Sequence, residues 1–301
     1  TPIVVLAGWN ESEGGRWSTK TFYILILVLQ TMSFGVFAAT DVFLFYVFFE
    51  AMLVPVYFLI GGYGSGERSA AAVKFLLYSL FGGLLMLASI IALYVLSGEQ
   101  GGHTFDIAAL SQLEMSSTTQ NLLFLGFFIA FAIKMPIFPF HTWQPNTYVN
   151  APTQGTMLLA GIMLKMGTFG VIKWLLPIVP LALDKWGSTA IALSVIGIVY
   201  ASCIAIAQKD FKRLIAYSSI AHVGLISAGI LSANQQGVQG AIMQMLAHGV
   251  NVVGLFFIAD ILLRHTGTNE INKLGGIRNI NPNFAVLFLI ISKSSSCVRL
   301  L

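Results

Sequence analysis

Long apolar runs alternate with short polar loops along almost the whole of this 301-residue chain. Each run is close to the length of about 20 residues that a helix needs to cross a bilayer. Backbone groups in lipid must be hydrogen-bonded within their own segment, and these runs are too long and too uniformly apolar for barrel strands. The pattern therefore predicts an all-α polytopic membrane protein. Its predicted spans are 21–39, 42–60, 73–96, 121–140, 154–176, 188–207, 214–232 and 238–262.

Two further apolar segments are incomplete. Residues 1–7 are typical of the end of another span, and a ninth span begins near residue 283 and stops early. The chain also has no initiator Met and no signal-peptide pattern, which favours a start inside a larger protein.

Lysine and arginine are unevenly divided between the loops of the two membrane faces. Cytoplasmic loops carry an excess of these residues, so the richer face is predicted to be cytoplasmic. Loop 97–120, which carries Glu99, Asp106 and Glu114, is then expected on the outer side. The richer face has nine basic residues and the other has two: Arg16, Lys20, Arg68, Lys209, Lys212, Arg213, Arg264, Lys273 and Arg278 against Lys173 and Lys185.

The composition excludes several classes of protein. The chain is 56% hydrophobic and only 9% charged, whereas soluble domains are about 45 to 50% apolar. Its net charge of +4 is spread over short loops, which argues against a nucleic-acid surface. Cys203 and Cys297 form neither a disulfide framework nor a metal-ligand spacing. The predicted environment is the lipid bilayer, with no cofactor and no metal bound.

One predicted span is interrupted beside a lysine. Lys134 is followed by Pro136 and Pro139, and each proline removes a backbone donor and clashes with the carbonyl one turn back. We therefore expect a broken helix near 134–141. Broken backbone at membrane depth is tolerated where protein or a wet cavity surrounds it, which indicates proton or ion access near Lys134. The alternative is a kink that only shapes packing, with Lys134 paired to an acid.

Three more ionisable residues occur within apolar runs. Charged side chains at the bilayer centre are costly, so they are candidates for function by default. Lys165 and Glu50 lie near the middle of their spans, and the alternative for each is a structural partner on another helix. Lys74 lies near the start of its span, where snorkelling to the interface explains it equally well.

Two histidines at similar depth complete the candidate site. His222 and His248 are both mid-span, and Gln244 and Asn251 share a helix face with His248. Histidine titrates near neutral pH, which suits proton transfer, although packing is an equal alternative. Asp260 precedes Arg264 by four residues, a spacing that predicts a simple ion pair at a helix end.

Eight short motifs follow one another along the chain: Phe49–Pro55, Phe131–Pro136, His141–Trp143, Ala151–Thr153, Leu159–Lys165, Asp210–Ser218, Ala221–Gly224 and Met245–Gly249. In this order they resemble the antiporter-like membrane subunits of respiratory complex I, from about residue 2 to 291. The resemblance implies a helical bundle in which Glu50, Lys74, Lys134, Lys165, His222 and His248 form a proton path.

Several further expectations follow from the resemblance. It implies a 14-helix subunit of NADH-quinone oxidoreductase in the bacterial inner membrane, partnered by other membrane subunits, with no redox centre of its own. Residues 1–291 would make an antiporter-like domain with about nine of those helices, and 292–301 would be a divergent tail. The chain departs from the family at Gln144–Asn146, where many relatives have an acidic residue, and after Ile291, where the second broken helix is missing.

Two other functions remain open from the sequence. A subunit of a multi-chain cation/proton antiporter or of a membrane-bound hydrogenase would use the same lysines and glutamate. A membrane scaffold without transport activity would not need them.

Overall fold

The computed structural model describes residues 1–9 and 17–294; Arg16, Cys297 and most of the predicted tail lie outside these ranges. Within them, eight helical segments are long and apolar enough to cross a membrane, which confirms the all-α polytopic class. The segments are Thr19–Ala38, Val42–Tyr63, Arg68–Glu99, Ser117–Lys134, Thr153–Ile178, Pro180–Ile206, Phe211–Leu231 and Gln235–Thr266.

Two of these eight spans consist of more than one helix. Single-helix spans are α2 (Thr19–Ala38), α5 (Arg68–Glu99), α7 (Ser117–Lys134), α12 (Pro180–Ile206), α13 (Phe211–Leu231) and α14 (Gln235–Thr266). The composite spans are α3 (Val42–Ala51) with α4 (Leu53–Tyr63), and α9 (Thr153–Leu158), η2 (Leu159–Met163), α10 (Leu164–Gly170), η3 (Val171–Leu175) and α11 (Leu176–Ile178). The short helices are α1 (Pro2–Ala7), α6 (Ile107–Leu110), α8 (Gln144–Asn150), η4 (Ile271–Lys273), α15 (Ile277–Ile280) and α16 (Pro282–Ser294).

Helices begin at polar caps, several residues before the apolar run itself. An N-cap side chain accepts a backbone N–H that the first turn leaves unpaired. This is why α13, capped by Asp210, starts at Phe211, earlier than the predicted 214. Helix α5 also starts early, at Arg68 instead of the predicted 73, although Glu67 before it makes no capping hydrogen bond through its side chain. The capping side chains are Ser18, Asp41, Ser116, Asp210 and Asn234.

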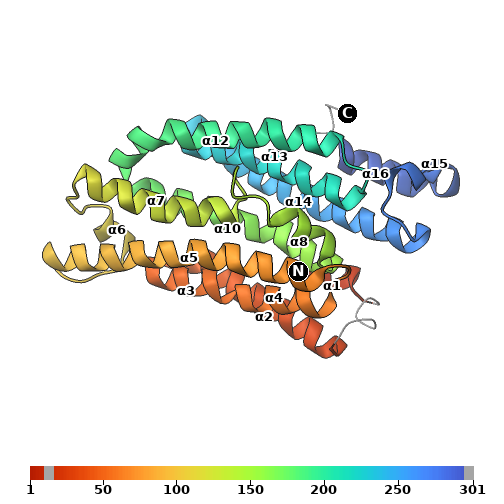
Figure 1. Cartoon of the computed structure of the whole chain (residues 1–301), viewed down its shortest axis with the longest axis horizontal. Coiled ribbons are helices and arrows are strands. Elements are labelled where there is room, and N and C mark those ends of the chain that lie inside the picture. The colour runs from red at the N-terminus through yellow and green to blue at the C-terminus, as the bar shows by residue number, and fades with distance from the viewer. Residues whose placement is uncertain (10–16, 295–301) are drawn as a thin grey trace.

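The spans lie side by side in an elongated bundle (Figure 1). The composite span 153–178 is at its centre, since 78% of its most apolar window is buried, against 28% for α2 and for α12. Apolar side chains such as Leu27, Leu77 and Val250 point outward from the rim, as expected for a lipid-facing surface. The centre of the bundle therefore belongs to the span that carries Lys165.

The predicted loops gather at the two ends of the bundle. The turn before α3 pairs with the turn before α6 through an Asp41–Asp106 bridge, and the turn before α13 pairs with the Glu270 segment at the other end. Lys173 and Lys185, counted above with the loops, lie within η3 and α12. Lys173 Nζ donates to Ala39 O, so it provides a hydrogen-bond donor for the backbone carbonyl just after the end of α2.

Candidate functional site

The predicted break in the helix at Lys134 is confirmed. Helix α7 ends at Lys134, and regular helix resumes only at Gln144, instead of running to residue 140 as the apolar pattern suggested. Trp143 closes the break by donating its Nε1–H to Ile133 O at 2.9 Å. Pro136 has no backbone N–H with which to continue the hydrogen bonds of the helix, which explains why the helix ends at this point.

Lys134 is enclosed at the end of α7, with 1% of its surface exposed. Its Nζ lies 4.6 Å from the ring centroid of Phe49 and 5.9 Å from that of Phe75, where cation–π attraction is favourable. It has no hydrogen-bond partner among the described residues. A buried polar group without a partner is where an ordered water or a transferable proton is expected.

Glu50 lies close enough to Lys134 for the two groups to interact electrostatically. Its Oε1 is buried and, in the described part of the chain, makes no hydrogen bond, just as Lys134 Nζ makes none. Its carboxylate packs against the backbone of Gly83 on α5, where an added methyl group would overlap it. Pairing of the glutamate with the lysine thus has a structural basis.

The helix carrying Glu50 is also interrupted, which the sequence analysis missed. The α-helix ends at Ala51 and restarts at Leu53, two residues before Pro55. Proline cannot donate to the carbonyl four residues earlier, here that of Ala51. Pro55 was the available signal, and Glu50 lies two residues before the interruption at Met52.

Lys165 lies between two π-helical segments, η2 and η3, which no local pattern predicted. Such widened turns are often found at functional sites. Lys165 is 7% exposed, and its Nζ donates to Ala160 O at 2.6 Å. The same Nζ lies 2.7 Å from Nδ1 of His248. The two residues belong to different helices that cross at the centre of the bundle.

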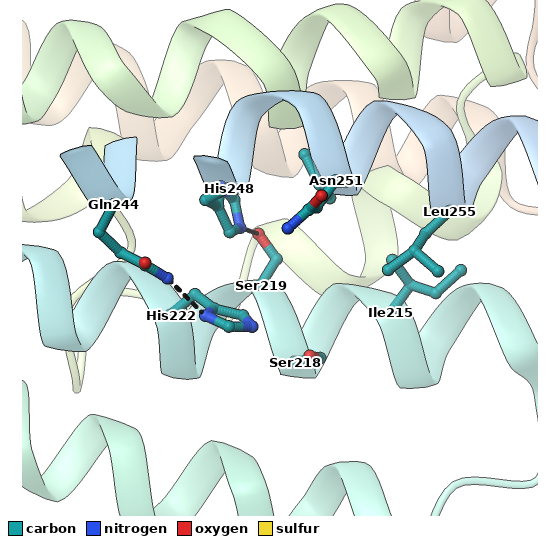
Figure 2. A pocket seen from close by; sticks show the side chains of 9 residues that line it. Ile215, Ser218, Ser219, His222, Gln244, His248, Asn251 and Leu255 are labelled. Atoms are coloured by element: carbon teal, nitrogen blue, oxygen red, sulfur yellow. Dashed lines mark hydrogen bonds between the residues drawn. The ribbon is translucent and has the colours of Figure 1, made fainter. Parts of the chain in front are cut away.

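The hydrogen-bonded chain continues beyond His248. When Lys165 is the donor, Nδ1 of His248 accepts the hydrogen bond. The other ring nitrogen of His248, Nε2, can then donate to Ser219 Oγ at 3.1 Å. The ring centroid of His222 is 5.4 Å from that of His248, and Gln244 Nε2 lies 3.1 Å from His222 Nδ1 (Figure 2). The structure therefore brings three of the predicted residues, Lys165, His222 and His248, into one cluster.

A small cavity separates the facing surfaces of α13 and α14 beside the histidines. Its volume of about 10 Å³ is roughly that of one water molecule. Most of the residues that line it are polar, as the shared face of Gln244, His248 and Asn251 predicted, and an apolar pair, Ile215 and Leu255, lies at one end (Figure 2).

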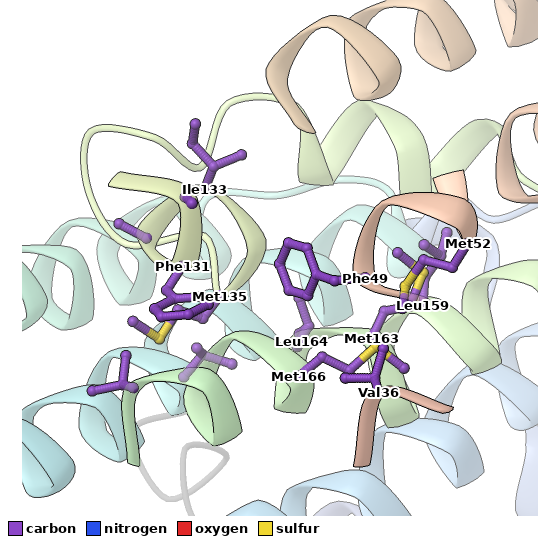
Figure 3. Packing of buried hydrophobic residues seen from close by; sticks show 14 of the residues in the cluster. Val36, Phe49, Met52, Phe131, Ile133, Met135, Leu159, Met163, Leu164 and Met166 are labelled. Atoms are coloured by element: carbon purple, nitrogen blue, oxygen red, sulfur yellow. The ribbon is translucent and has the colours of Figure 1, made fainter. Parts of the chain in front are cut away.

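Apolar side chains pack closely around the lysine sites. Phe49 and Met52, Phe131 and Met135, and Leu164 and Met166 come from three separate spans (Figure 3). A Cβ at Gly167 would lie 3.0 Å from Phe131 O and 3.3 Å from Lys134 Cβ, so the span carrying Lys165 touches the end of α7 through a glycine. Gly167 thus lets these two spans approach.

Lys74 lies apart from the buried lysines. It lines an open groove of about 340 Å³ together with Glu67, Asn146 and Arg213. Its Nζ lies 6.0 Å from the ring of Tyr78, whose hydroxyl is 2.7 Å from Thr142 Oγ1. Its participation in a proton path stays a prediction.

Fold and site together define a polytopic helical protein with ionisable side chains held at the centre of its bundle. A family model described as NADH:quinone oxidoreductase/Mrp antiporter, TM, matches residues 39–298. The chain belongs to this family.

Curated relatives agree with the family. Subunit M of NADH-quinone oxidoreductase from Rhodobacter capsulatus is 40% identical over 98% of this chain, and that from Rickettsia prowazekii is 44% identical over 92%. This chain covers 58% and 56% of their lengths, so it spans little more than half of each relative.

Solved structures show the same arrangement of helices. A chain of respiratory complex I from Thermus thermophilus matches with a TM-score of 0.89 and 33% identity, over 97% of this chain and 61% of the other. The Mrp complex from Dietzia matches with a TM-score of 0.77 and 21% identity over 90% of this chain and 50% of the other, a likeness of fold alone.

Proposed function

We propose that this chain is a proton-translocating membrane subunit of NADH-quinone oxidoreductase. Protons pass through its buried lysine and histidine side chains, while quinone reduction takes place in other subunits of the complex. The observation that carries the proposal is the contact between Lys165 and His248, continued by Ser219 and flanked by His222.

The proposed transfer needs no covalent chemistry. The Lys165 ammonium gives a proton to Nδ1 of His248, and Nε2–H of the same ring gives its proton to Ser219 Oγ while the Ser219 hydroxyl proton passes to a water molecule in the adjacent cavity. The lysine is then a neutral amine that a second proton can reload, and the ring must exchange its Nδ1 proton for one on Nε2 before the next transfer. Histidine suits this step because both ring nitrogens take part in turn.

In this proposal Glu50 controls the proton on Lys134. A nearby carboxylate charge changes how strongly a lysine holds its proton, and one unit of pKa corresponds to about 1.4 kcal/mol. Among the described residues, Lys134 has no hydrogen-bond partner that would hold it in one state, and it interacts electrostatically with Glu50. Movement of the glutamate charge would load or unload the lysine.

The proposed setting is the bacterial inner membrane, with other membrane subunits of the complex as partners. The subunit M relatives from Rhodobacter and Rickettsia support this choice over a cation/proton antiporter, since the Mrp structure is only 21% identical. A scaffold without transport activity would not need Lys165 and His248 in contact at the centre of the bundle.

The test is substitution of Lys165 and of Lys134 by alanine in the full-length subunit within its complete complex. Proton translocation per quinone reduced, measured in membrane vesicles, should be lost in both variants. Lys185→Ala, at an exposed position on α12, is the matched control and should behave like the unchanged protein. Normal translocation in an assembled Lys165→Ala complex would disprove the proposed function.

A further inference from the structure

A second buried ionic cluster lies where α9, α13 and α14 meet. Asp260 is 2% exposed, and Thr153 and Lys212 are also buried. Thr153 Oγ1 donates to Asp260 Oδ1 at 2.7 Å, and Lys212 Nζ donates to Thr153 Oγ1 at 3.4 Å. One hydroxyl therefore joins an acid and a base that come from two different helices.

Asp260 was predicted to form a simple helix-end ion pair, and that pair is present. Arg264 Nε lies 2.8 Å from Asp260 Oδ2, and 41% of the Arg264 side chain is exposed. The pair accounts for only one carboxylate oxygen, because the other accepts from Thr153. Burial of a carboxylate is costly unless its oxygens are paired, so both contacts help to hold the charge here. The cluster thus extends from an exposed guanidinium to the interior.

The cluster and the histidine cavity are neighbours on α13. Lys212, Ile215, Ser219 and His222 follow one another at spacings of three and four residues, which places them along one helix face. Ile215 and Leu255 face each other at the end of the cavity (Figure 2). The sequence of groups along this face is therefore an ionic cluster, an apolar pair, and then a polar cavity.

We propose that Asp260, Thr153 and Lys212 form the proton entry station for the histidine cluster, with Ile215 and Leu255 as the apolar gate between them. This inference rests on the proposed function. It identifies the membrane face from which protons reach the histidine cluster. Protons would enter at the end of the bundle where α13 begins, the end predicted to be cytoplasmic.

Each step conserves protons and charge. A hydronium ion beside Arg264 protonates the Asp260 carboxylate and leaves water. When Lys212 is a neutral amine, the Asp260 acid gives its proton to Thr153 Oγ1, while the Thr153 hydroxyl proton passes to Lys212 Nζ. The Lys212 ammonium then gives a proton, through water that crosses the gate, to the neutral ring of His222 or His248. Asp260 is again a carboxylate and Lys212 again a neutral amine.

The test is Thr153→Val in the full-length subunit within the complete complex, with activity expressed per assembled complex. Valine keeps the shape of threonine but removes the hydroxyl that joins Asp260 to Lys212. We expect proton translocation to fall by about 100-fold or more, since proton-transfer residues contribute at least this much. Its solvent deuterium isotope effect should rise as proton uptake becomes limiting. Thr153→Ser, which keeps the hydroxyl, should restore both quantities.

Thr147→Val is the matched control, because Thr147 is a buried threonine whose hydroxyl, in the part of the chain that the structure describes, donates within its own segment, to Trp143 O. Equal translocation rates in Thr153→Val and Thr147→Val would overturn the entry station. A loss in Thr153→Val that serine does not restore, with an unchanged isotope effect, would show a merely structural role and also overturn it. Lys165→Ala separates the two proposals, because normal translocation in that variant contradicts the proposed function itself.

Discussion

Lys165 Nζ lies 2.7 Å from His248 Nδ1, although 83 positions separate the two residues in the sequence. The contact joins the most buried span of the bundle to the long helix α14. A lysine that is 7% exposed has in this way gained a partner that can accept its proton.

Replacement of His248 by alanine removes both the proton acceptor of Lys165 and the partner of Ser219. We expect proton translocation in the complete complex to fall by about 100-fold, the lower limit of what proton-transfer groups supply. Vesicle acidification driven by NADH is the measurement. His265→Ala, at an exposed position on the same helix, is the control, and equal activities in the two variants would contradict the assigned role.

Substitution of Gly83 by alanine places a methyl group against the Glu50 carboxylate. The carboxylate must move relative to Lys134, so proton translocation per quinone reduced should fall although the complex still assembles. Gly240→Ala on α14 meets no atom within 4 Å and should be neutral, or stabilising by about 0.5 to 1 kcal/mol. Unchanged translocation in Gly83→Ala would remove the support for a carboxylate that acts on Lys134 from this position.

Trp143→Phe keeps the ring that packs on Phe75 but removes the hydrogen bond to Ile133 O. A buried carbonyl left without its donor costs about 1 to 3 kcal/mol, so the broken segment should be less stable. Thermal inactivation of the purified complex should occur at a lower temperature. Trp9→Phe, at an exposed position, is the control, and identical inactivation temperatures would argue against a closing role for Trp143.

Cysteine labelling tests the predicted orientation in the membrane. In a background without the native cysteines, Gln112→Cys should react with a membrane-impermeant reagent added to the periplasmic face of intact cells. Ala207→Cys, at the other end of the bundle, should react only after the membrane is opened. Both positions are exposed in the structure, so access depends on the side alone. The reverse pattern would invert the orientation derived from the loop charges.

Local patterns in the sequence determined the eight spans, the break after Lys134 and the depth of the ionisable residues. Lipid requires about 20 apolar residues for each crossing helix, and a proline in the interior of a helix interrupts it, so both features can be derived without knowing the neighbours. The motifs around Lys134 and Lys165 also sufficed to identify the family.

Only the tertiary structure decided which of these residues meet. The contact of Lys165 with His248, the packing of Glu50 on Gly83, and the link through Thr153 between Asp260 and Lys212 all depend on how each helix is rotated and displaced along its axis. The π-helical turns on both sides of Lys165 contribute to that rotation, and hydrophobic periodicity carries no signal for them. Contacts between helices result from the packing of whole faces, which is why no single stretch of the sequence contains them.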